Sequence, residues 1–235
     1  MGENINQIQT NGDLRVPMTD VVRFIRQLSH DLRNNLNAAE LQSAYLNELA
    51  PDAELKDELK RLRGMLSEMG GNLNRLTSSL AEVKLTRMQY EAVAFVEDLQ
   101  QKVAGQFPEE KGIEWKIEVG DASLEIDPQL LQQAFLELFA NALRHGRGDG
   151  EIEASAKRDG NDFVFELHEP KTSFHDSPEN WGREPFRKVA HGHYGLGLHR
   201  ARTIIETHGG RLSVRYDSPA TDLITTVTLP IIEAK

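Results

Sequence analysis

The chain has 235 residues and a formal net charge of −10, with 39% apolar and 27% charged residues. This composition is that of a globular protein with a hydrophobic core, and the acidic balance argues against nucleic-acid binding, which needs a basic surface. No apolar run approaches the roughly 18 residues of a membrane span, so we expect no direct membrane contact. The polar N-terminus lacks a signal peptide and the chain lacks cysteine, which fits a cytoplasmic location.

Residues 18–90 have the spacing of two long amphipathic helices, preceded by a polar segment, residues 1–17, that we expect to be flexible. From Asp20 to Leu49 the apolar residues recur at helical intervals, and Pro51 ends this helix because proline disfavours helical geometry at the preceding residue. A second helix then has a heptad seam from Leu55 to Val83. The two segments predict an antiparallel helical hairpin.

A hairpin of this kind cannot bury both of its apolar faces by itself. One solution is a homodimer, in which two hairpins form a four-helix bundle. The other is that the hairpin packs against the rest of its own chain. We favour the homodimer, because the seam is too long for a small second domain to cover.

After Met88 the pattern changes, and residues 91–235 are expected to form a second domain. Asp127-Pro128 is typical of a helix start, and Gly209-Gly210 is typical of a helix end. The segregation of strands and helices predicts an α+β sandwich, with helices on one face of a mixed sheet. The expected helices span 94–107, 128–145 and 195–208, and the expected strands span 113–119, 123–126, 152–157, 162–168, 211–216 and 223–229.

His30 lies within the segment HDLRNN of the first helix. Leu28 and Leu32 lie two positions away on either side, about 200° around the helix, so the imidazole is expected to point away from the seam. Asp31 is adjacent, and Asn34 lies one turn further along the same face. An exposed imidazole beside a carboxylate has the features of a nucleophile with a neighbouring base. A packing role and a metal-ligand role are the alternatives.

The helix LLQQAFLELFANALRHG, residues 130–146, has a polar arc that contains Glu137, Asn141, Arg144 and His145. Carboxylate and amide oxygens suit Mg²⁺, and a neighbouring arginine suits phosphate. An ordinary polar helix face is the alternative.

Gly192, Gly195 and Gly197 precede a helix in the segment HGHYGLGLHRARTIIETHGG, residues 191–210. Backbone N–H groups in such a loop, together with the helix N-terminus, can hold a phosphate group. Five Arg/Lys residues and one acid lie between Arg183 and Arg202, and this cationic region favours an anionic ligand. A solvated loop with scattered charge is the alternative.

The order of these features over about residues 18–232 resembles the sensor histidine kinases of two-component signalling. SHDLRNNL resembles the phosphoacceptor box, ELFANALRHG the asparagine-bearing ATP box, EPFRK the phenylalanine-bearing segment and GLGLHRARTIIETHGG the second glycine box. The resemblance implies a dimerisation and histidine-phosphotransfer domain at 18–90 and a catalytic ATP-binding domain of the Bergerat type at 91–235. It also implies ATP and Mg²⁺ as cofactors, and a response-regulator receiver domain as partner.

The resemblance further implies roles for individual residues. His30 would be the phosphoacceptor, Asp31 the acid/base that activates it, and Asn34 the residue that orients water when the partner is dephosphorylated. In the ATP site Asn141 would hold Mg²⁺. The other implied cofactor-binding residues are Glu137, which stands where the family often has Asn, Arg144 and His145 near the phosphates, Glu169 for adenine, and Gly192, Gly195, Leu196 and Gly197 in the loop over the phosphates.

Two positions depart from the family pattern. Asn35 stands where proline is usual, and LHEPKTSF replaces the first glycine box, with Glu169 at the adenine-binding Asp position and Pro170-Lys171 in place of the turn glycines. Loss of these glycines restricts close approach of the backbone to a nucleotide.

Two functions follow. The first is a histidine kinase that autophosphorylates His30 from ATP, passes the phosphoryl group to an Asp of a response regulator and can also act as a phosphatase. The second is an ATP-independent dimeric phosphotransfer or adaptor protein with a degenerate Bergerat domain. Retention of Asn141 and the glycine loop favours the kinase. Since only about 17 residues precede the first helix, the input signal is expected from a partner, from the dimer itself or from a part of a longer protein.

Overall fold

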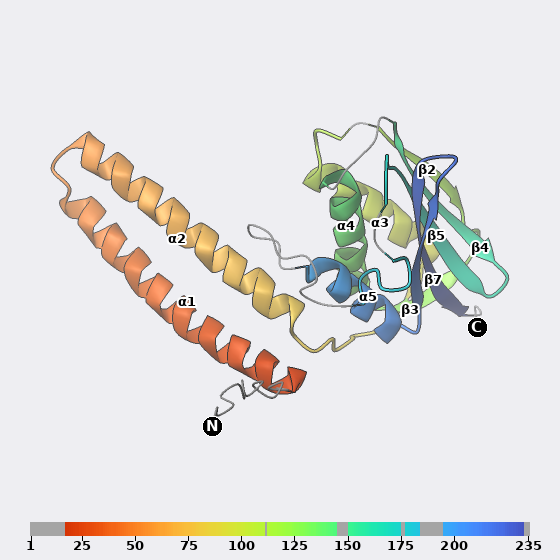
Figure 1. The fold of residues 1–235 in the computed structure, drawn as a ribbon, viewed down its shortest axis with the longest axis horizontal. Helices are drawn as coiled ribbons and strands as arrows, with labels where there is room; N and C mark the ends of the chain where they lie inside the picture. The colour runs from red at the N-terminus through yellow and green to blue at the C-terminus, as the bar shows by residue number, and fades with distance from the viewer. Residues whose placement is uncertain (1–16, 111, 145–149, 175–176, 184–194, 233–235) are drawn as a thin grey trace, which may run out of the picture. The chain divides into compact units, whose positions relative to one another are not determined.

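The computed structural model describes residues 17–110, 112–144, 150–174, 177–183 and 195–232 (Figure 1). These residues form two compact units, one that ends at Ser78 and one that begins at Ser79. The predicted boundary at residue 90 lies after this division. Strand β1 (Met88–Glu91) pairs with β3 (Ser123–Ile126), so the residues from Ser79 onward join the second unit.

The first unit is a helical hairpin of α1 (Met18–Leu49) and α2 (Ala53–Ser79). Asp52 begins the second helix, because its Oδ1 accepts a hydrogen bond of 2.8 Å from the N–H of Leu55. The predicted seam continues to Val83, whereas α2 ends at Ser79. Val83 instead packs against the hydrophobic core of the second unit.

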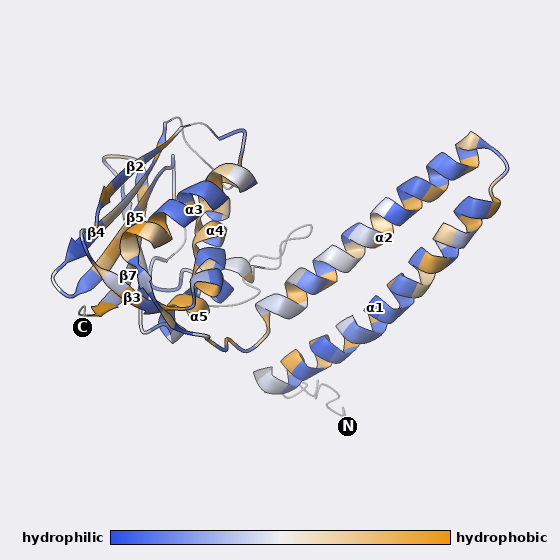
Figure 2. Ribbon diagram, turned by 180° about the vertical axis from the view of Figure 1, so that it is seen from behind, coloured by the Kyte–Doolittle hydropathy of each residue, from blue (hydrophilic) through white to orange (hydrophobic). Residues whose placement is uncertain are grey.

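The face that α1 turns toward α2 includes buried polar residues. Ser29 and Ser43 are buried there, and Arg33 Nη2 donates to Thr77 Oγ1 at 3.4 Å. Leu28 and Leu32, both predicted seam residues, remain 44% and 40% exposed in the single chain. Apolar residues recur along both helices (Figure 2). We call the following exposed residues the apolar surface of the hairpin: Phe24, Leu28, Leu32, Leu41, Tyr45, Leu46, Leu49, Leu55, Leu62, Met65 and Met69.

The second unit is an α+β sandwich built on a mixed sheet, as predicted. Its further elements are α3 (Ala92–Gln106), β2 (Ile113–Glu118), α4 (Pro128–Arg144), β4 (Ile152–Asp159), β5 (Asp162–Pro170), α5 (Gly197–Thr207), β6 (Arg211–Asp217) and β7 (Asp222–Ile232). The strand order is β1-β3-β7-β5-β4-β2, and β6 pairs with β7. Helices α3, α4 and α5 cover one face of this sheet (Figure 1).

The core lies between the sheet and the helices. Along β5 every second residue is buried, so Phe163, Phe165 and Leu167 face the same layer. Phe135 of α4 packs edge-on against Phe165, with ring centroids 4.8 Å apart. Glu169 is the next residue of this buried stripe, so the alternation of β5 carries a carboxylate to the same face as the core.

Both predicted helix boundaries of this unit have the expected caps. Asp127 Oδ1 accepts a hydrogen bond of 3.0 Å from the N–H of Leu130 at the start of α4. After α5, Gly209 adopts a φ of 84°, its N–H donates to Glu206 O, and the N–H of Gly210 donates to Ile205 O, both at 3.0 Å. This pair of bonds closes the last turn of the helix.

Within the described ranges, every helix is too short or too polar to cross a lipid bilayer.

Candidate functional site

His30 stands on an exposed face of α1, and the structure places it together with Asp31 and Asn34. The side chains of His30 and Asp31 are 63% and 59% exposed. Asp31 Oδ1 lies 3.2 Å from His30 Nδ1, and Asn34 Nδ2 lies 3.5 Å from the same nitrogen. Helical spacing therefore brings an imidazole, a carboxylate and an amide into one cluster.

Asp31 favours one tautomer of the neutral imidazole. Hydrogen bonds from His30 and then from Gln27, whose Nε2 donates to Asp31 Oδ1 at 3.0 Å, lower the pKa of Asp31. An ionised carboxylate can only accept, so the Nδ1 that faces it carries the proton. In the neutral ring the lone pair then lies on Nε2, which is the nitrogen free to act as a nucleophile.

In the second unit, α4 and α5 bring Glu137 and Gly197 into direct contact. A Cβ atom at Gly197 would lie only 1.7 Å from Glu137 Oε1, so glycine alone leaves room for this carboxylate. Gly197 is the first residue of α5, whose N-cap, Leu196, makes no side-chain capping bond. The partial positive charge at the helix N-terminus favours an anion at this place.

The loop that leads into α5 requires glycine at one more predicted position. Gly195 has a φ of 63°, in the left-handed region that side chains with a Cβ rarely adopt. Leu196, which follows, is buried and anchors the loop to the domain. Gly192 and His145 lie outside the described residues, as does the side chain of Arg144 at the end of α4.

Asn141 is half-buried on α4, one turn beyond the exposed Glu137. One amide and one carboxylate are a sparse ligand set for a metal ion. In the described part of the chain, no group of three or more His, Asp or Glu residues could hold a metal. The donors fit Mg²⁺ in its usual nucleotide-bound form, in which phosphate oxygens and water supply most ligands.

Glu169 lies at the end of β5 and forms an ion pair with Lys171. The two side chains are only 3% and 12% exposed, and Lys171 Nζ contacts Glu169 Oε1. Burial raises the pKa of Glu169 to about 7, against the opposing effect of Lys171, while the nearby Asp222 raises it further. Lys171 was not among the site residues expected from the sequence. Its i, i+2 spacing from Glu169 could have indicated it, because this spacing places both side chains on one face of an extended strand.

The backbone around Lys171 is held by neighbours on both sides. Its N–H donates to Thr221 O at 2.7 Å, and its carbonyl accepts a hydrogen bond of 3.0 Å from the hydroxyl of Tyr216. The preceding Pro170 packs against Gly150, where a Cβ would lie 2.8 Å from Pro170 Cγ. These contacts hold the backbone from which the Lys171 side chain extends.

Two arginines of the predicted cationic region serve the fold rather than an anionic ligand. Arg202 is buried and donates from Nε and Nη2 to Trp181 O, at 3.2 and 2.8 Å. Arg200 Nη1 donates to Ala81 O. Charge counting along the sequence could not reveal these carbonyl partners. Arg187 and Lys188 of the same region lie outside the described residues.

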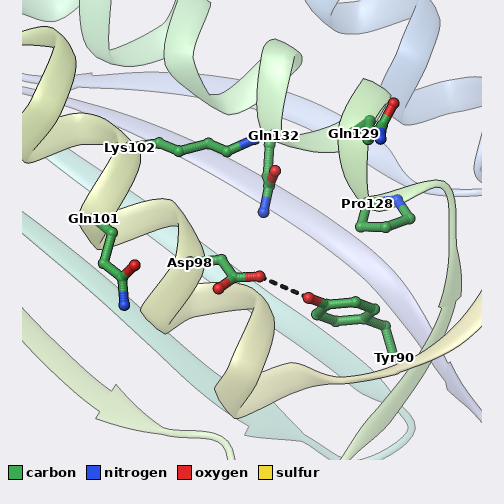
Figure 3. Close-up of a pocket in the computed structure, with 7 residues that line it drawn as sticks. All are labelled: Tyr90, Asp98, Gln101, Lys102, Pro128, Gln129 and Gln132. Atoms are coloured by element: carbon green, nitrogen blue, oxygen red, sulfur yellow. Dashed lines mark hydrogen bonds between the residues drawn. The ribbon is translucent and has the colours of Figure 1, made fainter.

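A polar pocket of about 420 Å³ lies apart from the predicted site residues, between β1, α3 and α4 (Figure 3). Within it Tyr90 donates a hydrogen bond of 2.6 Å to Asp98 Oδ2, and this bond raises the pKa of Tyr90. No motif in the sequence indicated this pocket. Its lining residues are Tyr90, Asp98, Gln101, Lys102, Pro128, Gln129 and Gln132.

The fold and the site define first a class of domain. Residues 126–233 match the family described as histidine kinase-, DNA gyrase B- and HSP90-like ATPase. Among solved structures, full-length ShkA in complex with AMPPNP has a TM-score of 0.71 and 19% identity, covering 90% of this chain and 46% of that chain. The Acinetobacter baumannii histidine kinase AdeS has a TM-score of 0.52 and 17% identity, covering 86% of this chain and 96% of that chain. Both share the fold.

Curated relatives extend the similarity to the rest of the chain. The alginate biosynthesis sensor protein KinB of Pseudomonas aeruginosa is 26% identical, over 82% of this chain and 34% of its own length. The sensor histidine kinase ZraS of Salmonella typhi is 27% identical over 87% and 44%, and the histidine protein kinase DivJ of Caulobacter vibrioides is 25% identical over 90% and 38%.

The chain spans between 34% and 44% of the length of these relatives. The resemblance to sensor histidine kinases with a Bergerat-type ATPase domain is thereby confirmed.

Proposed function

We propose that the chain is a two-component histidine kinase, which moves the γ-phosphoryl group of ATP to His30 and then to an Asp of a response-regulator receiver domain. The observation that supports this most directly is the exposed His30–Asp31 pair on a helical hairpin. This pair occurs in a chain whose second unit matches the histidine kinase-, DNA gyrase B- and HSP90-like ATPase family.

In this proposal the chemistry at His30 is a phosphoryl transfer. The lone pair of Nε2 forms a bond to the γ-phosphorus as the bond to the β–γ bridging oxygen breaks, and ADP leaves with that electron pair. Asp31 accepts the hydrogen bond from Nδ1–H and stabilises the positive charge that develops on the ring. Attack by the receiver Asp would then return the electron pair to Nε2. In the separate phosphatase reaction Asn34, which lies against the imidazole, would orient the water that hydrolyses the aspartyl phosphate of the receiver domain.

In the second unit the chain's residues would bind and position ATP. Asn141 would coordinate Mg²⁺, and the backbone from Gly195 to Gly197 would approach the phosphates where glycine leaves access. Glu169 would accept a hydrogen bond from the base. Catalysis of this kind depends on alignment and neutralisation of charge rather than on covalent participation of the domain.

The hairpin would serve as the dimerisation and phosphotransfer domain. The apolar surface of the hairpin includes Phe24, 65% exposed, and Leu41, 73% exposed, and a monomeric protein rarely leaves such a surface uncovered. A second copy would cover it and complete a four-helix bundle. The homodimer is thus the arrangement in which both faces of α1 and α2 become buried.

Labelling with γ-³²P-ATP and Mg²⁺ tests the kinase. We expect acid-labile, alkali-stable label on the wild-type protein and none on His30→Gln, which keeps a polar side chain beside Asp31 but removes the nucleophile. Arg23→Gln is the matched control, because Arg23 lies two turns earlier on the same exposed face. Equal labelling of wild type and His30→Gln would disprove the assignment of His30.

One observation favours a second function, that of an adaptor without ATP. The buried Glu169–Lys171 pair occupies the position of the missing glycine box. Calorimetry with ADP and Mg²⁺ separates the two functions. Measurable heat at micromolar to millimolar ADP supports the kinase, and its absence together with an intact fold supports the adaptor.

A further inference from the structure

Within the part of the chain that the structure describes, Lys171 and Glu169 have hydrogen-bonding capacity beyond the bond that joins them. An ammonium group has three donors and a carboxylate has two acceptor oxygens. Among the described residues, each of these side chains is bonded only to the other. Buried polar groups normally find further partners, from protein, water or ligand. The spare donors of Lys171 and the spare acceptor of Glu169 therefore indicate a ligand that offers an acceptor beside a donor.

The backbone at this strand end supplies no donor of its own. Pro170 has no N–H group. The N–H of Lys171 is already bonded to Thr221 O at 2.7 Å. A hydrogen bond from residues 170 and 171 to a ligand must therefore come from the Lys171 side chain.

The edge of adenine has the complementary pattern, because its 6-amino group is a donor and the adjacent N1 is an acceptor. We propose that Lys171 is a specificity-determining residue that donates to N1 of adenine while Glu169 accepts from the 6-amino group. This inference rests on the proposed function, which requires an adenine nucleotide. Pro170-Lys171 then replaces the missing glycine turn with a side-chain donor rather than abolishing the base site.

The fold holds the backbone of Lys171 in place before any ligand arrives. Tyr216 donates to the carbonyl of Lys171, and the Tyr216 ring packs against Phe174 with centroids 6.0 Å apart. Glu169 is fixed by the β5–β7 ladder, where it lies opposite Leu223. Two groups held by rigid strands lose little freedom on binding, so each hydrogen bond contributes to affinity.

The test compares ADP with 1-deaza-ADP, in which a C–H group replaces N1, by calorimetry on the full chain. Wild type should bind ADP about tenfold more tightly, the effect of one charge-assisted hydrogen bond. Lys171→Met should bind ADP about tenfold more weakly than wild type and should no longer distinguish the two ligands.

Lys157→Met is the matched control, because Lys157 also pairs with a glutamate of β5, Glu166, at 3.3 Å, but its side chain is 49% exposed. This variant should keep the wild-type preference. The comparison of two ligands on wild type needs no variant, so it remains decisive if Lys171→Met does not fold.

Three results would overturn the inference. Equal affinity of wild type for both ligands would show that nothing donates to N1. Tighter ADP binding by Lys171→Met would show that Lys171 blocks the site. An unchanged preference in Lys171→Met, with His30 still labelled, would remove only the role of Lys171. If wild type binds no ADP, the ATP premise of the proposed function fails as well.

Discussion

The two units differ in how far each buries its own apolar residues. In the described residues, eleven of the fourteen exposed large apolar side chains belong to the hairpin. The α+β unit instead encloses Phe95, Phe135, Phe139, Phe163 and Phe165 almost completely. The α+β unit therefore has a core of its own, whereas in the proposed homodimer a second copy would supply much of the burial that stabilises the hairpin.

A charge introduced into the apolar surface of the hairpin should have the largest effect. Leu62→Glu would place two uncompensated carboxylates in the proposed dimer interface, one from each chain, and should weaken the dimer by roughly ten-thousandfold or more. Ser67→Glu adds the same charge at an exposed polar position of α2 and should leave the dimer intact. Sedimentation velocity over a range of concentrations measures both. A Leu62→Glu protein that sediments as wild type would contradict the proposed interface.

A cavity in the α+β core should affect that unit alone. Phe135 is fully buried, and its ring lies 5.4 Å from that of Phe95 and 4.8 Å from that of Phe165. Phe135→Ala should lower the free energy of unfolding of this unit by about 3–5 kcal/mol. Phe24→Ala, in the hairpin, should leave the same transition unchanged. Calorimetric scans that show both transitions moving together for either variant would contradict the independence of the two cores.

The periodicity of the sequence predicted most helices and strands but not all of the contacts between them. The helix expected at 128–145 spans 128–144, because its cap residues and apolar stripe are local signals. An apolar stripe does not state which surface covers it, so the sequence did not indicate that Ser29 and Ser43 of α1 are buried while Leu28 and Leu32 stay partly exposed. Strand β1 was missed, since its four residues MQYE show no clear alternation and its pairing with β3 is a long-range contact.

The site shows the same division between local and long-range information. His30, Asp31 and Asn34 are neighbours through helical spacing alone, so the sequence was sufficient to group them. Contact between Glu137 and Gly197 depends on the packing of α4 against α5, which no local pattern encodes. Only a family resemblance placed these residues in one site.

A substitution of the buried Glu169 should change the stability less than the cavity in the core does. Its pKa in the fold, about 7, lies above the ordinary value, so the fold favours the protonated form. The contribution of this group to stability is therefore full below about pH 4.5 and is lost as the pH rises through 7. Between pH 5 and pH 7.5, wild type should lose about 2–3 kcal/mol of stability that Glu169→Gln does not lose. Urea denaturation at several pH values measures this difference.

Glu166→Gln is the control for that titration, because Glu166 lies on β5 in a more exposed pair with Lys157. It should show the same pH dependence as wild type. If Glu169→Gln also follows wild type, burial of Glu169 does not control its ionisation.

The smallest effect is expected at Asp127, where one residue of the α+β unit serves both a helix and the segment that precedes β1. Its Oδ1 caps α4 at Leu130, and its Oδ2 accepts a hydrogen bond of 3.0 Å from the N–H of Thr86. Burial alone would raise the pKa of Asp127, but these N–H donors outweigh it and the pKa is lowered. Asp127→Ala should therefore cost about 1–2 kcal/mol of stability, and the loss should diminish as the pH falls and the wild-type carboxylate is protonated.

Asp127→Asn separates the two roles of this residue. The amide oxygen can still cap α4, but the NH₂ group cannot accept the bond from Thr86, so the loss should be about half that of Asp127→Ala. Hydrogen exchange at the Thr86 amide should rise in both variants, whereas exchange at Leu130 should rise only in Asp127→Ala. Equal exchange at Leu130 in the two variants would mean that the cap requires the charge of the carboxylate, since the oxygen acceptor is present in Asn as well.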